Sequence, residues 1–131
     1  MHRILQPEGW APPRGYSNGI AATGRFVFVS GQVGWNAQGE FETDDLVAQI
    51  RIALENVVAV LAAGGANAAH VTALTWYFTD KQEYVTRRTE VGEAYRAVMG
   101  QHYPAMTAVE VASLIESRAK VEIQAVAVVP G

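Results

Sequence analysis

The chain contains no cysteine among its 131 residues. Disulfides, thiolate nucleophiles and zinc–sulfur centres are therefore excluded. The N-terminal segment MHRILQPEGWAPPRG lacks the apolar stretch that a signal peptide needs, and no apolar run approaches the ~20 residues of a membrane span. We therefore expect a cytoplasmic protein with no membrane partner.

The chain is also poor in positive charge. Ten lysines and arginines stand against thirteen acidic residues, which gives a formal net charge of -3 and an isoelectric point near 5.5. The only close basic cluster is the pair Arg87-Arg88. Affinity for nucleic acid depends mainly on neutralising phosphates, so we expect no nucleic-acid partner.

What remains is an ordinary globular composition. Half of the residues are apolar and 18% are charged, which is unlike a disordered or membrane chain. A chain of this length fits one core better than two. We expect a single domain over residues 1–131.

Two segments have the periodicity of helices. Residues 43–65 place apolar side chains on one stripe, with Thr43 as the expected N-cap, two aspartates in the first turn and Gly64-Gly65 as the stop. A second helix is expected over residues 81–99, with a weaker apolar stripe.

Other segments have the composition of strands. The stretch FVFV (26–29), bounded by glycines, predicts a strand buried on both faces. Further strands are expected over residues 71–80, 106–113 and 119–129. This order predicts an α+β fold, in which a mixed sheet carries two helices on one face.

Both faces of such a sheet would be apolar, above all in residues 26–29 and 123–129. A monomer would then expose a large apolar patch, which soluble monomers rarely do. We expect a homo-oligomer. The alternative is that the loop at residues 6–18 folds over the open face.

Histidines and serines give no strong signal. His2, His70 and His102 are far apart in sequence and lack carboxylates at ligand spacing, so we expect no metal site. Ser17 and Ser30 lie in no G-x-S-x-G elbow.

Glu122 is a carboxylate in the C-terminal strand, whose other residues have the composition of a buried strand. Glu110 is its counterpart in the preceding strand. Alternation allows either side chain to face solvent. A carboxylate in a partly dry cleft would instead have a raised pKa and could activate a water.

Several segments together resemble the RidA/YjgF enamine–imine deaminase family, and they occur in the family's order over nearly the whole chain. They are RGYSNG (14–19), FVFVSGQVG (26–34), LENVVAVLAAGGA (54–66), YFTD (77–80), PAMTAVEVA (104–112) and VEIQAVAVV (121–129). The resemblance implies a chorismate-mutase-like fold and a barrel-like homotrimer with ligand clefts between subunits. It also implies hydrolysis of enamines and imines, such as 2-aminoacrylate, to 2-keto acids and ammonia, with no cofactor.

The family's roles transfer residue by residue. Tyr16 would close the cleft over a small-molecule ligand, and the backbone N–H of Gly31 would hold its carboxylate. Glu122 would position the hydrolytic water, as the catalytic residue. The backbone of Ala108 would line the cleft. In the archetypes an arginine pairs with the substrate carboxylate, and here that position is Met106.

Methionine cannot make a charge-assisted bidentate contact, and offers an apolar wall instead. Activity on 2-aminoacrylate should therefore be weak or absent. Arg14, beside Tyr16, is the best candidate for a replacement anchor and Arg118 a weaker one, although both can equally be solvated surface residues. Trp35 would either floor a larger pocket or pack in the trimer.

The leading hypothesis is hydrolysis of an imine or enamine that is larger or less acidic than 2-aminoacrylate, with Glu122 aligning water. The alternative is a non-catalytic trimer that binds a metabolite. An endoribonuclease, an activity known within the superfamily, is disfavoured by the acidic charge.

Overall fold

The computed structural model describes residues 2–131. Its main elements follow one another along the chain, with a single 3₁₀ turn at Ala68–His70 before β4. They are β1 (Arg3–Leu5), β2 (Gly19–Ala21), β3 (Gly24–Val33), α1 (Leu46–Ala63), β4 (Val71–Phe78), α2 (Lys81–Thr86), α3 (Arg88–Met99), β5 (Ala105–Glu110) and β6 (Val121–Pro130).

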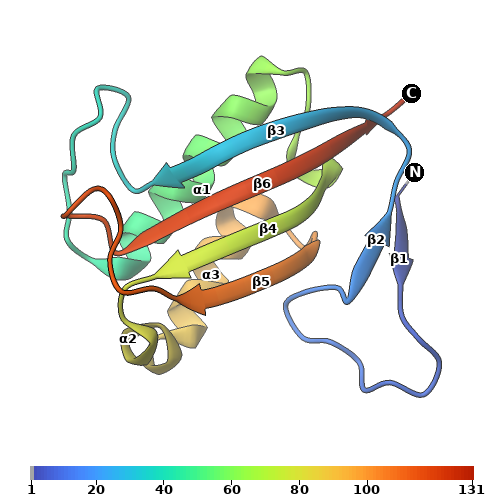
Figure 1. Cartoon of the computed structure of the whole chain (residues 1–131), viewed down its shortest axis with the longest axis horizontal. Helices are drawn as coiled ribbons and strands as arrows, with labels where there is room; N and C mark the ends of the chain where they lie inside the picture. Colours follow the sequence, from blue (N-terminus) through green and yellow to red (C-terminus); the bar gives the residue numbers. More distant parts are fainter. Residues whose placement is uncertain (1) are drawn as a thin grey trace.

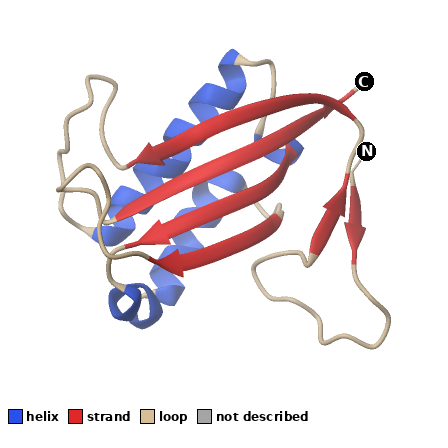
Figure 2. Cartoon of the chain, in the orientation of Figure 1, coloured by secondary structure: helices blue, strands red, loops and turns tan. Residues whose placement is uncertain are grey.

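The main sheet has the strand order β3-β6-β4-β5. β6 pairs antiparallel with both β3 and β4, whereas β4 and β5 are parallel. A parallel pair needs a crossover, and α2 and α3 provide it. Figures 1 and 2 show α1 and α3 on the same face of this sheet. The predicted α+β fold with a mixed sheet and helices on one face is confirmed.

The core lies between α1, α3 and the sheet. The buried stripe of α1 packs against α3 and against side chains of β3 and β6 that face the helices. α1 is long and apolar enough to cross a membrane, contrary to the expectation from sequence. Its buried stripe makes it the core helix of this fold. Its buried members are Leu46, Gln49, Ile50, Ala53, Leu54, Val57 and Leu61.

The start of α1 differs from the prediction. Asp45 is the N-cap, and its carboxylate accepts a hydrogen bond from the backbone N–H of Ala48. Thr43 lies two residues earlier, where its hydroxyl accepts from the N–H of Asp45. The predicted glycine stop is confirmed, because Gly64 caps the helix and Gly65 has a φ of +76°.

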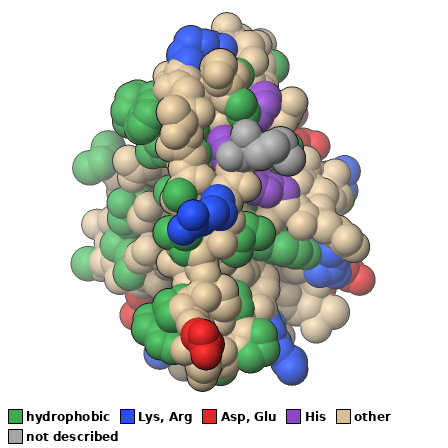
Figure 3. Space-filling model, turned by 90° about the vertical axis from the view of Figure 1, so that its right-hand side faces the viewer, with side chains coloured by type: hydrophobic (Ala, Val, Ile, Leu, Met, Phe, Trp, Pro, Cys, Tyr) green, Lys and Arg blue, Asp and Glu red, His purple; other side chains and the backbone are tan. Residues whose placement is uncertain are grey.

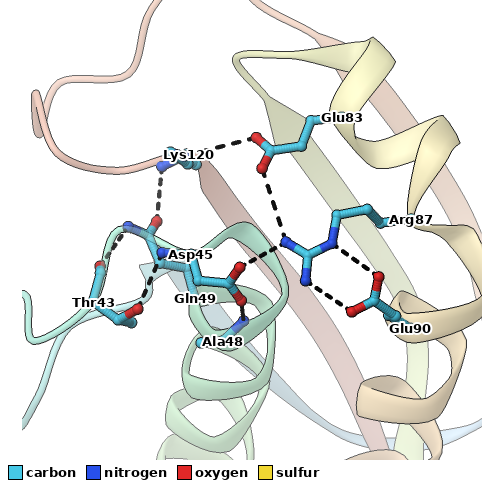
Figure 4. Close-up of polar contacts among 8 residues, drawn as sticks. All are labelled: Thr43, Asp45, Ala48, Gln49, Glu83, Arg87, Glu90 and Lys120. Atoms are coloured by element: carbon cyan, nitrogen blue, oxygen red, sulfur yellow. Dashed lines mark hydrogen bonds and ion pairs between the residues drawn. The ribbon is translucent and has the colours of Figure 1, made fainter.

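The predicted helix over residues 81–99 is two helices that meet at Arg87. The Arg87 guanidinium donates to Asp45 Oδ1 at 2.6 Å and to both oxygens of Glu90 at 3.0 and 2.8 Å. Figure 4 shows it reaching from the junction of α2 and α3 to Asp45, the N-cap of α1. Hydrogen bonds from Arg87 lower the pKa of both the Asp45 and Glu90 carboxyls. Arg87 therefore ties the junction of α2 and α3 to the start of α1.

The prediction of a strand buried on both faces at residues 26–29 is wrong. Phe26 is 55% exposed and Phe28 is 72% exposed, whereas Val29 is only 2% exposed. The reason is that the helices cover only one face of the sheet, and the side chains of Phe26 and Phe28 lie on the other face. An apolar patch is therefore exposed on this face, as the homo-oligomer prediction requires.

The loop at residues 6–18 does not cover that patch. It lies beside the start of β5, where Ser17 forms a parallel bridge with Ala105 and its N–H donates to the carbonyl of Pro104 at 3.0 Å. Figure 1 shows the β1–β2 hairpin standing to one side of the main sheet. The alternative in which this loop shields the open face is thus contradicted.

The histidine side chains gather on the side of the molecule shown in Figure 3, although they are distant in sequence. Each is engaged by backbone: His2 Nε2 lies 2.9 Å from the carbonyl of His70, His70 Nδ1 accepts from the N–H of Asn67, and His102 Nε2 lies 2.7 Å from the carbonyl of Val71. Within residues 2–131 no group of three or more histidine or acidic side chains is arranged to hold a metal ion.

Candidate functional site

Five of the seven predicted site residues line two hollows on opposite sides of the sheet. The first, here called the α3–β5 cavity, has a volume of about 570 Å³. The second, called the Gly31–Glu122 hollow, has a volume of about 490 Å³. The α3–β5 cavity is lined by Arg14, Gly15, Tyr16, Trp76, Tyr84, Arg88, Val91, Gly92, Tyr95, Arg96, Tyr103 and Met106.

Aromatic rings form much of the wall of the α3–β5 cavity. Trp76 of β4 lies 6.1 Å from the ring of Tyr95 in α3, which stacks on Tyr103 at 5.4 Å. The Tyr95 hydroxyl donates to the carbonyl of His102, and burial raises its pKa above the ordinary value. Tyr95 is therefore a neutral phenol that holds the segment entering β5.

Met106 lies in this cavity on the helix-facing side of β5. It is the β5 partner of Leu74, and its half-buried side chain packs against the hydrophobic core. The same side chain borders the tyrosine-lined space. A flexible thioether suits such a surface because sulfur makes favourable contacts with aromatic rings. Met106 is thus an apolar wall that supplies no charge.

The predicted residues Arg14 and Tyr16 meet Met106 in the same cavity. The loop that carries them turns at Gly15, whose φ of +75° favours glycine. Ser17 then fixes the loop, because its hydroxyl donates to the carbonyl of Tyr103 and its N–H to that of Pro104. Two groups separated by about ninety residues in sequence are brought together in this way.

The sequence analysis missed Arg88 and Arg96, which both line the α3–β5 cavity. The Arg88 guanidinium lies 5.9 Å from the centre of the Tyr84 ring. Arg88, Gly92 and Arg96 recur every four residues in α3, so they share one helical face. That spacing was a usable signal, but only the apolar stripe of this segment was considered.

The Gly31–Glu122 hollow lies on the open side of the sheet. Ile123 is buried toward the helices, so alternation turns Glu122 to the other side. A Cβ atom on Gly31 would lie 1.9 Å from Oε2 of Glu122, which means that the carboxylate covers this glycine. A register shift in β3 between Val29 and Gln32 places Gly31 there. Only glycine allows this approach.

Glu110, the other strand carboxylate, has a different role. Its Oε2 accepts a hydrogen bond from the backbone N–H of Lys81 at 2.8 Å, at the start of α2. It therefore ties the end of β5 to the first turn of that helix and lies in neither hollow.

Two further predicted residues lie elsewhere. Ala108 lines a neighbouring hollow that shares Tyr84 and Arg88 with the α3–β5 cavity. Trp35 packs 5.7 Å from the ring of Phe41 and lines neither the α3–β5 cavity nor the Gly31–Glu122 hollow.

Arg118, the weaker candidate for a replacement anchor, is already engaged. Its guanidinium pairs with Asp44 at 2.8 Å and donates to the carbonyl of Phe41. It lines neither the α3–β5 cavity nor the Gly31–Glu122 hollow.

A family model described as Endoribonuclease L-PSP matches residues 8–129. The chain belongs to this family. The family includes proteins of the RidA/YjgF type, so the resemblance drawn from sequence is confirmed. The match covers both hollows and the loop that carries Arg14 and Tyr16.

Relatives and solved structures agree with this membership. The 2-iminobutanoate/2-iminopropanoate deaminase of Salmonella typhimurium is 33% identical over 108 residues, which cover 80% of each chain. A crystal structure of the Rid-family protein YyfB from Yersinia pestis has a TM-score of 0.82 and 30% identity over 98% of both chains. Escherichia coli TdcF with bound serine has a TM-score of 0.69 and 31% identity, over 97% of this chain and 98% of that one.

Proposed function

We propose that this protein hydrolyses a reactive imine or enamine to a carbonyl compound and ammonia. The observation that carries the proposal is the Glu122 carboxylate lying over Gly31 in an open-faced hollow, in a chain whose relatives include a named imine deaminase. A carboxylate next to an exposed backbone offers a proton acceptor and a place for a ligand together.

The reaction needs little machinery. Glu122 accepts a proton from water as the water oxygen bonds to the imine carbon. The nitrogen takes up protons, the C–N bond breaks, and ammonia leaves as the carbonyl forms. For an enamine, protonation at carbon first gives the imine. No redox change occurs, so the proposal requires no cofactor.

We further propose that the working unit is a homotrimer whose clefts join the two hollows across subunits. Within one chain, Glu122 lies on the open side of the sheet and Met106 on the helix-covered side, so one copy does not bring them together. The exposed rings of Phe26 and Phe28, 5.9 Å apart, favour a second copy against the open face.

The test is ammonia release from imines generated freshly by an amino-acid oxidase from alanine and from phenylalanine. The wild type should exceed the uncatalysed rate with at least one of them, and Glu122→Gln should lower that excess by roughly 10²-fold or more. Glu110→Gln is the matched control, since it changes the other strand carboxylate. Equal rates in Glu122→Gln and the wild type would contradict the proposed role.

A second candidate is a non-catalytic trimer that binds a metabolite, and Met106 is the observation that favours it. The apolar wall supplies no charge for the carboxylate of a small imino acid. A raised melting temperature with keto acids, but no ammonia release from any imine, would select this function. The net charge of -3 gives no support to ribonuclease activity.

A further inference from the structure

The α3–β5 cavity collects arginines that lack partners. Within residues 2–131, Arg3, Arg14, Arg88 and Arg96 are the arginines whose side chains make neither a hydrogen bond nor an ion pair. All but Arg3 line this cavity. No acidic residue is among the lining residues, in a chain with a net charge of -3. The cavity is therefore a local concentration of positive charge that suits an anion.

The geometry of α3 leaves space for one of these arginines. A Cβ atom on Gly92 would lie 3.2 Å from Nη1 of Arg96, so the guanidinium folds back over this glycine, one turn earlier in the helix. Glycine inside a helix costs roughly 0.5–1 kcal/mol relative to alanine. Gly92 itself lines the cavity. Its missing side chain gives Arg96 room at the cavity wall.

The remaining walls suit a planar group. Trp76, Tyr84, Tyr95 and Tyr103 present ring faces or edges, and Met106 adds a polarizable apolar side chain. Trp76 is only 5% exposed, so its ring forms a closed part of this wall.

The cavity, at about 570 Å³, lies within the roughly 300–1,000 Å³ typical of pockets for drug-sized ligands. A three-carbon imino acid would leave most of this space to water.

We propose that Arg88 and Arg96, with Arg14, anchor the carboxylate of a 2-imino acid that bears an aromatic side chain. The ring of this substrate lies among the tyrosines and Met106. The substrate class rests on the proposed function, since Glu122 of a neighbouring copy would supply the proton acceptor. The arginines of α3 thus take over the anchoring that residue 106 does not provide.

Phenylpyruvate tests this assignment apart from turnover, because it is a stable keto acid with the same carboxylate and ring. Its Kd is measured by calorimetry on the wild-type protein, beside pyruvate and inorganic phosphate. Phenylpyruvate should bind at least tenfold more tightly than either. Equal affinity for pyruvate would overturn the aromatic assignment, and equal affinity for phosphate would show a general anion site instead.

Arg88→Gln and Arg96→Gln should each weaken phenylpyruvate binding by roughly tenfold or more. Arg96→Lys should recover part of that loss. Arg3→Gln is the matched control, since it removes an unpartnered arginine outside the cavity. The inference fails if both cavity variants bind like the wild type, or if Arg3→Gln weakens binding equally.

The two proposals fail separately. If Glu122→Gln loses ammonia release but binds phenylpyruvate as tightly as the wild type does, both proposals are supported. Binding that depends on the arginines without any ammonia release would retain the anchor and remove the catalytic function.

Discussion

The two hollows on opposite sides of the sheet are lined by side chains of opposite charge. The α3–β5 cavity has three arginines and no carboxylate among its lining residues. The Gly31–Glu122 hollow has a carboxylate and no basic residue among its own. Oppositely charged side chains in one cleft would pair with each other. Within one chain the sheet separates these groups, so the guanidiniums and the carboxylate do not pair with each other.

The largest effect should come from displacing the carboxylate on the open side. In Gly31→Ala the new methyl would occupy the space of the Glu122 carboxylate, 1.9 Å from Oε2. We expect ammonia release to fall by roughly 10²-fold, as for loss of a general base. Thermal unfolding should change little, because the end of the Glu122 side chain can move. Unchanged activity would show that this approach is not used in catalysis.

Disrupting the proposed contact between subunits, which would join the two hollows, should have the next largest effect. Phe28→Asp places a charge on the exposed apolar patch of β3, and we expect the proposed trimer to dissociate into monomers with loss of activity. Light scattering after size-exclusion chromatography measures the mass. Val60→Asp, on an exposed part of α1, is the control for an added surface charge. A trimer that persists in Phe28→Asp would exclude this face as the interface.

A positive charge in place of Met106 would test the chemistry of the α3–β5 cavity further. Met106→Arg adds a fourth guanidinium to the α3–β5 cavity, and we expect hydrolysis of the alanine-derived imine to rise about tenfold, as for a charged hydrogen bond gained. Affinity for phenylpyruvate should fall because the wall becomes polar. Met106→Leu, a nearly volume-conserving change, should leave both properties close to the wild type. A Met106→Arg protein with no gain on the small imine contradicts this account.

The smallest effect should come from the hydrogen bonds that Arg87 donates to Asp45 and Glu90. Arg87 lowers the pKa values of Asp45 and Glu90 from their ordinary values of 3.8 and 4.5. A lowered pKa in the folded state adds stability above the ordinary value, and that stability is lost as pH falls through the folded-state value.

Arg87→Gln should therefore be less stable than the wild type at pH 7, and the difference should shrink below pH ~4. Urea unfolding followed by circular dichroism measures both limits. Arg51→Gln, which removes an exposed pair with Glu55 at 3.6 Å, should show a smaller difference at either pH. A gap between Arg87→Gln and the wild type that stays constant with pH would contradict the linkage.

Much of the fold follows from sequence because local patterns determine it. The apolar period of α1 and the composition of β4 and β6 predict their positions to within a few residues. The break at Arg87 was not predictable in this way, since its partner Asp45 lies 42 residues away. The exposure of Phe26 and Phe28 also depends on which face of the sheet the helices cover, which local sequence does not specify.

The site was predictable in part for the same reason. Segments resembling a family identified Tyr16, Gly31, Met106 and Glu122, and the structure places them in two hollows. Arg88 and Arg96 were missed because only the apolar stripe of the predicted helix over residues 81–99 was considered, although both arginines lie on one helical face. Which of these residues lie on each side of the sheet follows from the register in which the strands pair.

Different faces of α3 pack in the hydrophobic core and line the α3–β5 cavity. Ala94 and Met99 on one side are buried in the fold, while Arg88 and Arg96 are exposed at the cavity. Replacing an exposed arginine leaves the hydrophobic core untouched, so the chemical preference of the cavity can change by single substitutions at little cost in stability. We expect the range of accepted substrates to be the most evolvable property of this chain, and a library at positions 88 and 96 to be the most direct route to redirecting it.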